Sequence, residues 1–157
     1  MTLLINKDFV CHDIRVTIAL PESYDATKTY PVVFLNDGQL DYLGKLANSV
    51  ILIGLEPKNR LDDFTPWYAQ ALRPGSPDFG GKLASYHDRL FGHILNSIQE
   101  EFRLDDSRMA YGGYSLGGLA AISSLYGSDK MPFYLFHLWI LLVSRFCSLL
   151  PIPPATQ

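Results

Sequence analysis

The sequence predicts an α/β fold in which helices pack on a mainly parallel β-sheet. Short apolar runs rich in Val, Ile and Phe are bounded by Gly, Asn, Asp and Pro, as buried strands are. An amphipathic helical pattern follows them, and strands that alternate with helices indicate a layered arrangement. The 157 residues suit one domain, and a content of 48% hydrophobic and 18% charged residues excludes a largely disordered protein.

Three stretches in the first half are predicted strands. Residues Ile14 to Leu20 alternate in character and stop at Pro21, which suits an early antiparallel strand. The runs Pro31–Leu35 and Ser49–Leu55 are continuously apolar, which is typical of strands buried on both faces. Between Pro57 and Gly81 the sequence predicts a long irregular segment, and a connection of this length is usually functional or mobile.

Two helices are predicted in the second half. The first spans Lys82 to Phe102, and its apolar residues recur at three- and four-residue steps to form a single face. After a short predicted strand at Arg108–Tyr111, the second helix runs over Leu116–Tyr126 with Gly127 as its C-cap. The apolar face of the first helix consists of Leu83, Tyr86, Leu90, Ile94, Ile98 and Phe102.

The net charge, the cysteines and the N-terminal residues restrict the partners and the cellular location that we expect. The formal net charge is −3 and the basic residues form no run, which argues against a nucleic-acid or anionic-membrane partner. Cys11 and Cys147 show no motif spacing and fit a reducing compartment. The first residues lack the pattern of a signal peptide, so the expected location is cytoplasmic.

The strongest motif is a G-x-S-x-G pattern centred on Ser115, between a predicted strand and a predicted helix. This order predicts a nucleophile elbow, a sharp turn that projects the serine hydroxyl above the sheet. Small residues at Gly113 and Gly117 prevent a clash between the strand and the returning helix. The N–H of Leu116 is then placed to bind an oxyanion. A glycine-rich turn that merely joins a strand to a helix is the alternative.

A second oxyanion donor is expected from the loop after an earlier central strand. The sequence NDGQ follows the strand PVVFL, and Gly38 allows the backbone to approach closely. The N–H of Gln39 is the candidate donor. Ordinary Asn-Asp-Gly turn chemistry is the alternative explanation of this loop.

Three stretches, VVFLNDGQ, IGLEPKNRLDDFTPW and GGYSLGG, together resemble one family. It is the esterase branch of the α/β-hydrolases, which includes esterase D (S-formylglutathione hydrolase), enterochelin esterase and the mycolyltransferases. The resemblance runs from about residue 10 to residue 130. It implies that Ser115 is the nucleophile and that the N–H groups of Leu116 and Gln39 form the oxyanion hole. It also implies an ester or thioester substrate and no metal or organic cofactor.

The segment from Asn59 to Trp67 resembles a loop at the mouth of the site in this family. Arg60 and Asp63 are expected to pair and hold the loop, while Phe64 and Trp67 wall a substrate cleft. A solvated loop with one buried aromatic anchor is the alternative.

The sequence departs from the family pattern after the elbow helix. The triad of this fold runs in the order Ser, acid, His, yet Asp129 and His137 are the only carboxylate and histidine after Ser115. Neither stands where the family places its acid and base. The remaining histidines precede the serine and are not expected to contact it, and no metal site is expected from them: His12, His87 and His93.

These departures predict an incomplete α/β-hydrolase fold, that is, a C-terminally truncated member of the family. Residues 1–130 are expected to form the N-terminal part of the domain, and residues 131–157 a divergent apolar and Pro-rich tail. For the apolar run 133–150, a strand covering the open sheet edge is favoured over a poorly packed accidental sequence and over a membrane segment.

Three hypotheses for the function follow, of which the third is a small membrane-associated protein, because of the apolar C-terminal run. The first is a serine esterase that forms an acyl-enzyme through Ser115. The second is a catalytically inactive fragment or pseudo-esterase that lacks the downstream acid and histidine. An open sheet edge beside an apolar run also predicts self-association between chains.

Overall fold

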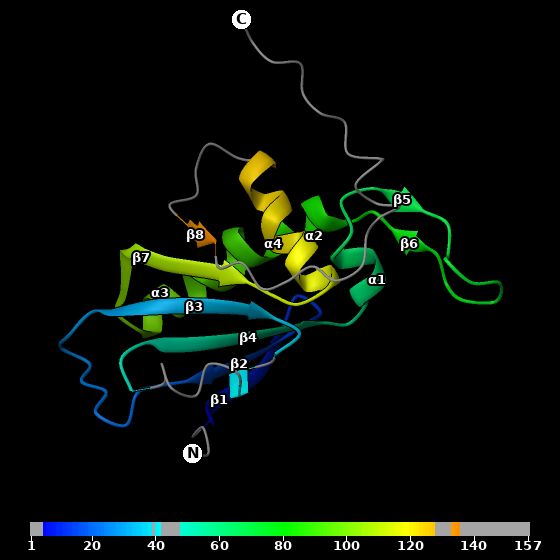
Figure 1. Ribbon diagram of the computed structural model, residues 1–157. Coiled ribbons are helices and arrows are strands. Elements are labelled where there is room, and N and C mark those ends of the chain that lie inside the picture. Colours follow the sequence, from blue (N-terminus) through cyan, green and yellow to red (C-terminus); the bar gives the residue numbers. More distant parts are fainter. Residues whose placement is uncertain (1–4, 39, 42–47, 128–132, 136–157) are drawn as a thin grey trace, which may run out of the picture.

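The computed structural model describes residues 5–38, 40–41, 48–127 and 133–135 (Figure 1). The strands of its main sheet are β1 (Ile5–Cys11), β2 (Ile14–Ala19), β3 (Tyr30–Asn36), β4 (Ile51–Pro57), β7 (Leu104–Gly112) and β8 (Phe133–Leu135). A separate hairpin consists of β5 (Tyr68–Ala69) and β6 (Phe79–Gly80). The helices are α1 (Arg60–Asp63), α2 (Leu83–Arg89), α3 (Leu95–Glu101) and α4 (Leu116–Gly127).

The strand order in the main sheet is β1-β2-β4-β3-β7-β8. Strands β4, β3, β7 and β8 run parallel to one another, whereas β1 pairs antiparallel with β2 and β2 pairs antiparallel with β4. Figure 1 shows β3 and β7 side by side and pointing toward the same end of the sheet. The prediction of a mainly parallel α/β fold is therefore confirmed.

The predicted strands at β2, β3 and β4 are confirmed, but β1 is an additional strand. Its turn consists of His12 and Asp13, with φ of 51° and 61°, which is the left-handed geometry of a two-residue hairpin. Charged side chains interrupt its apolar pattern: Asp8 pairs with Arg15, and Lys7 pairs with Glu101 on α3. Because β1 is an edge strand, these charges also protect it from pairing with another chain.

Strand β7 begins at Leu104, four residues before the predicted start at Arg108. After the buried Leu104, the added residues are polar and at least partly exposed, so their sequence does not show the apolar run of a buried strand. Pairing of Leu104 with Tyr30 of β3 brings them into the sheet. Long-range pairing, and not local composition, therefore sets the start of this strand.

The predicted helix from Lys82 to Phe102 is present, but a π-helical turn at Leu90–Ile94 divides it. Its apolar residues from Tyr86 onward are four residues apart. Because a regular α-helix has 3.6 residues per turn, residues at this spacing would shift gradually around the helix. The wider π turn compensates for this drift. All six residues of the predicted apolar face are buried: Leu83, Tyr86, Leu90, Ile94, Ile98 and Phe102.

The main hydrophobic core lies between the sheet and helices α2, α3 and α4. A smaller cluster, which includes Val33 and Leu52, is formed by sheet residues that alternate with those of the main core. None of the helices in the described residues combines the length and the apolar character that crossing a membrane requires. Figure 1 shows the β5–β6 hairpin extending beyond α1, at the end of the sheet toward which β3 and β7 point.

Strand β8 pairs in parallel with β7, from Met109 opposite Phe133 to Tyr111 opposite Leu135. The start of the apolar run 133–150 thus covers the outer edge of β7, in agreement with the favoured strand interpretation. The rest of that run lies outside the described residues, as do Asp129 and His137.

Candidate functional site

Ser115 stands at the junction of β7 and α4. Strand β7 ends at Gly112, α4 begins at Leu116, and the φ angle of Ser115 is 54°. A left-handed backbone costs a residue with a side chain about 1–2 kcal/mol, so the surrounding structure has to hold it. The predicted strand–serine–helix order, with the serine at the carboxyl end of a parallel strand, is confirmed.

Both glycines of the motif are sterically required. A Cβ added to Gly113 would lie 2.6 Å from the carbonyl carbon of Gly117, which is a backbone clash that no rotamer can relieve. A Cβ added to Gly117 would lie 2.9 Å from the Cβ of Asn36. The close approach of β7, α4 and the end of β3 therefore leaves no room for larger residues.

The first turn of α4 faces the serine. The N–H of Gly117 donates to the Tyr114 carbonyl at 2.9 Å, and the N–H of Leu119 donates to the Ser115 carbonyl at 3.0 Å. The N–H of Leu116 heads the helix, where the helix dipole favours negative charge. Leu116 is therefore the first residue of the helix, and its role as an oxyanion donor stays a prediction.

The loop after β3 reaches the same place, because β3 and β7 are adjacent parallel strands. A Cβ added to Gly117 would lie 3.1 Å from Oδ2 of Asp37. Asp37 and Gly38 both have positive φ, at 66° and 62°, so the turn after β3 is tight. Gln39, the second expected oxyanion donor, lies outside the described residues.

The expected pairing of Arg60 with Asp63 is wrong. Arg60 instead binds Asp37 through two hydrogen bonds, Nε to Oδ1 at 2.6 Å and Nη2 to Oδ2 at 3.0 Å. Asp63 bonds to Arg89 of α2 at 2.7 Å. In the folded chain the two side chains bind partners that are distant in sequence, so each links α1 to another part of the chain. Burial raises the pKa of Asp63, and the Arg89 guanidinium opposes this shift.

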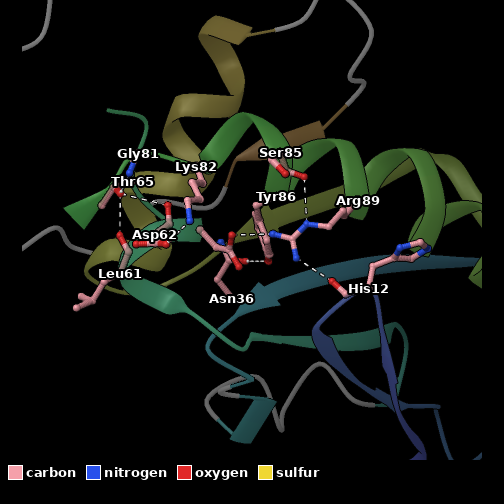
Figure 2. Close-up of polar contacts among 11 residues, drawn as sticks. His12, Asn36, Leu61, Asp62, Thr65, Gly81, Lys82, Ser85, Tyr86 and Arg89 are labelled. Carbon is pink, nitrogen blue, oxygen red and sulfur yellow. Dashed lines mark hydrogen bonds and ion pairs between the residues drawn. The ribbon is translucent and has the colours of Figure 1, made fainter. Parts of the chain in front are cut away.

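Arg89 also joins the β1–β2 turn to the helices (Figure 2). Its Nη1 donates to the His12 carbonyl at 2.8 Å, and its Nε donates to the Ser85 carbonyl at 3.2 Å. Thr65 plays a similar part at the base of the β5–β6 hairpin, where its hydroxyl bonds to the Leu61 carbonyl and to the Gly81 N–H. The segment predicted to be irregular is thus held by specific polar contacts.

The two aromatic residues of this segment differ in their surroundings. Phe64 is fully buried, packs edge-on against Tyr86 at 5.3 Å, and lies beneath the guanidinium of Arg60 at 5.6 Å. It is therefore the buried anchor of the segment and not an exposed cleft wall. Trp67 is half-buried at the base of the β5–β6 hairpin, beside Gly81. Arg60, the third predicted cleft residue, binds Asp37 in the loop beside the elbow.

Hydrogen bonds among three buried side chains near the elbow were not predicted from the sequence: Asn36, Tyr86 and Tyr111. Their hydrogen bonds join β3, α2 and β7. Burial raises the pKa of the Tyr86 hydroxyl and that of the Tyr111 hydroxyl, so both remain protonated donors. A polar residue that ends an otherwise apolar strand, as in VVFLN, was the available signal.

The described histidines contact groups other than Ser115. The Nε2 atom of His87 lies 3.3 Å from the Tyr111 hydroxyl, and burial lowers the pKa of His87 to about 4. His12 and His93 stack on each other at 4.5 Å and are exposed. In the part of the chain that the structure describes, no hydrogen bond joins a histidine to Ser115, and His137 lies outside that part. The same residues contain no group of three side chains suited to a metal ion.

A serine in a strained strand-to-helix turn above a parallel sheet places the chain in the α/β-hydrolase class of folds. Residues 10–130 match the sequence model of the Esterase family, described as "Putative esterase". The chain therefore belongs to the esterase family.

Three known proteins resemble this chain in sequence or in fold. Uncharacterized protein YbbA of Bacillus subtilis (strain 168) is 32% identical over 125 residues, which cover 71% of this chain and 50% of YbbA. The crystal structure of an IroE-like serine hydrolase from Shewanella oneidensis has 28% identity and a TM-score of 0.69, with 81% of this chain and 47% of that chain covered. Siderophore hydrolase EstB from Aspergillus nidulans has 18% identity and a TM-score of 0.63. The match covers 83% of this chain and 54% of EstB, and it supports the fold alone.

The chain thus spans about half the length of the relatives it matches.

Proposed function

We propose that this chain carries the nucleophile of a serine ester hydrolase, and that Ser115 forms an acyl-enzyme with an ester or thioester substrate. The observation that carries the proposal is the backbone of Ser115, held at a φ of 54° between a parallel strand and the first turn of a helix. A strained residue at such a position points to function. Membership of the esterase family and the likeness to a serine hydrolase at 28% identity support the same chemistry.

In the proposed reaction the Oγ atom of Ser115 attacks the acyl carbonyl carbon, and the hydroxyl proton passes to a general base. The N–H groups of Leu116 and Gln39 donate to the oxyanion that forms. The carbon–oxygen or carbon–sulfur bond then breaks, and the alcohol or thiol leaves with a proton. Water attacks the acyl-enzyme, releases the carboxylic acid and restores the serine.

A second candidate is a chain that is catalytically weak by itself. It is favoured because no described histidine bonds to Ser115. Without a base the serine hydroxyl stays protonated at neutral pH, and loss of the base costs about four to six orders of magnitude in rate. Binding and oxyanion stabilisation would then remain as the residual functions of the site.

Hydrolysis of p-nitrophenyl acetate, with and without added imidazole, tests both candidates. The variants are Ser115→Ala and a control, Ser123→Ala, which lies two turns further along α4. We expect low turnover by the wild type and by Ser123→Ala, and none above background in Ser115→Ala. Because imidazole itself cleaves this ester, each rate is compared with a protein-free control at the same imidazole concentration, and only the proteins that contain Ser115 should gain rate beyond that control. Robust turnover without imidazole, lost in Ser115→Ala, would reject the weak-chain candidate. Equal rates in all three proteins would reject Ser115 as the nucleophile.

A further inference from the structure

A buried asparagine supports the elbow from below. Asn36 is the last residue of β3, and its side chain has no solvent exposure. Its hydrogen-bond partners come from three other elements: Tyr86 on α2, Tyr111 on β7 and Gly117 on α4. Figure 2 shows the carboxamide of Asn36 facing the Tyr86 hydroxyl. One side chain therefore connects the sheet, a flanking helix and the helix that starts at the elbow.

The hydrogen bonds determine how the carboxamide of Asn36 is oriented. Its Nδ2 donates to the Gly117 carbonyl at 2.8 Å and to the Tyr111 hydroxyl at 3.0 Å. Its Oδ1 accepts a hydrogen bond from the Tyr86 hydroxyl at 2.7 Å. The reverse orientation would set two acceptors, Oδ1 and the Gly117 carbonyl, against each other. The Nδ2 atom, and not Oδ1, therefore faces the Gly117 carbonyl of the elbow.

Packing reinforces the same contact. A Cβ added to either Gly113 or Gly117 would lie 2.9 Å from the Cβ of Asn36, so both motif glycines rest on this side chain. Ser115, between them, has a left-handed backbone that its surroundings must hold in place. Asn36 contacts the elbow on both sides of that strained residue.

We propose that Asn36 is a positioning residue for the nucleophile elbow. Its carboxamide fixes the Gly117 peptide and with it the first turn of α4, from which the Ser115 hydroxyl and the Leu116 N–H project. Tyr86 fixes the amide in turn. Asn36 acts through Gly117, and this role rests on the function proposed above for Ser115. Small displacements of a reacting group are sufficient to slow a reaction about 100-fold.

The test measures the second-order rate constant for labelling of Ser115 by a fluorophosphonate. Mass spectrometry monitors the labelling over hours. Asn36→Leu keeps the branched shape but removes the amide, and we expect labelling about tenfold slower or more. Asn36→Asp can still donate to Gly117 while its carboxyl is protonated. Its rate relative to the wild type should therefore fall by about tenfold between about pH 5 and about pH 8. Tyr86→Phe keeps the Gly117 bond and should slow labelling only about threefold.

Two controls separate positioning from a general loss of stability. Asn96→Leu removes another amide that donates to a glycine carbonyl, that of Gly92 at 2.7 Å, but on exposed α3. Ile94→Val weakens the core without touching the elbow. Both should be labelled at the wild-type rate. Labelling of folded Asn36→Leu within about twofold of the wild type, or equal slowing by Ile94→Val, would overturn the proposal. If Asn36→Leu does not fold, two other results test the proposal. They are the pH dependence of the labelling rate of Asn36→Asp relative to the wild type, and the labelling rate of Tyr86→Phe.

Failure of the serine mechanism would be seen separately, as absence of labelling at Ser115 in the wild type. Amide hydrogen exchange of residues 116–119 then reports on positioning without any reaction. We expect faster exchange there in Asn36→Leu than in Ile94→Val. Equal exchange in these two variants would contradict the positioning role.

Discussion

The elbow and the segment from Arg60 to Gly81 lie at the same end of the sheet but are held in different ways. The elbow is built by close packing at the backbone: Gly113 lies against the backbone of Gly117, and both glycines lie against the Cβ of Asn36. The segment instead depends on side chains that reach distant partners, as Arg60 does with Asp37 and Asp63 does with Arg89. Backbone contacts leave a short sequence signature, whereas long-range ion pairs leave none.

This difference predicts how the two regions respond to substitution. Gly113 of the elbow should not tolerate the addition of a single methyl group, because the nearest clashing atoms belong to the backbone of Gly117. The segment should lose stability in proportion to the burial of each ion pair that is broken. The predictions below proceed from the largest expected effect to the smallest.

Gly113→Ala should have the largest effect. Its Cβ would lie 2.6 Å from the backbone of Gly117, and we expect a loss of about 3 kcal/mol in the free energy of unfolding. Gly92→Ala is the matched control, since a Cβ at this helical position has nothing within 4 Å. It should raise stability by about 0.5–1 kcal/mol. Urea denaturation measures both, and a Gly113→Ala protein as stable as the wild type would contradict the steric account of the elbow.

Arg89→Met should cost about 2 kcal/mol, because it leaves the buried Asp63 carboxylate without its partner at 2.7 Å. The comparison variant is Arg108→Met, which breaks an exposed pair with Asp105 and should not change the urea midpoint measurably. Equal midpoint shifts in the two variants would show that burial does not control the strength of these pairs.

Stability should fall as the pH is lowered from about 6.5 to about 4, because of His87. Burial lowers the pKa of His87 in the folded chain to about 4, whereas the ordinary value is about 6.5. The unfolded chain therefore takes up the proton first, and the stabilising contribution of neutral His87, complete above about pH 6.5, is lost progressively down to about pH 4. His87→Gln should flatten this part of the pH profile. An unchanged slope in that variant would exclude His87 as the cause.

The contact between the two regions should show the smallest effect. A double-mutant cycle of Arg60→Met and Asp37→Asn should give a coupling free energy of about 1 kcal/mol, because the pair is bidentate but partly exposed. The equivalent cycle for Lys82 and Asp62 should show a weaker coupling, since the lysine makes a single exposed contact. A larger coupling for the Lys82 pair would reverse the expected order.

Local patterns were sufficient to predict the elements that build the elbow. The apolar runs of β3 and β4, the single face from Leu83 to Phe102 and the G-x-S-x-G turn all reflect short-range geometry, and the structure reproduces them. The edge strand β1 was missed because Lys7 and Asp8 break its alternation. The partners of Arg60 and Asp63 were assigned wrongly because proximity along the chain does not determine ion pairs across the fold.

The roles of single polar residues were the least predictable. In the sequence, Asn36 resembles part of an ordinary Asn-Asp-Gly turn. Only the folded structure shows that its amide donates to the Gly117 carbonyl. Phe64 was expected to wall a cleft but is buried against Tyr86, because α1 turns its side chain toward the core. Both cases depend on the packing of α2 and α4 over the sheet, which no short window of sequence contains.

Peptide mapping after incubation with a fluorophosphonate tests the central claim, that Ser115 is the nucleophile, most directly. The account predicts one slowly formed adduct, located on Ser115, absent from Ser115→Ala and unchanged in Ser123→Ala. An adduct on another residue, or identical labelling of wild type and Ser115→Ala, would contradict it.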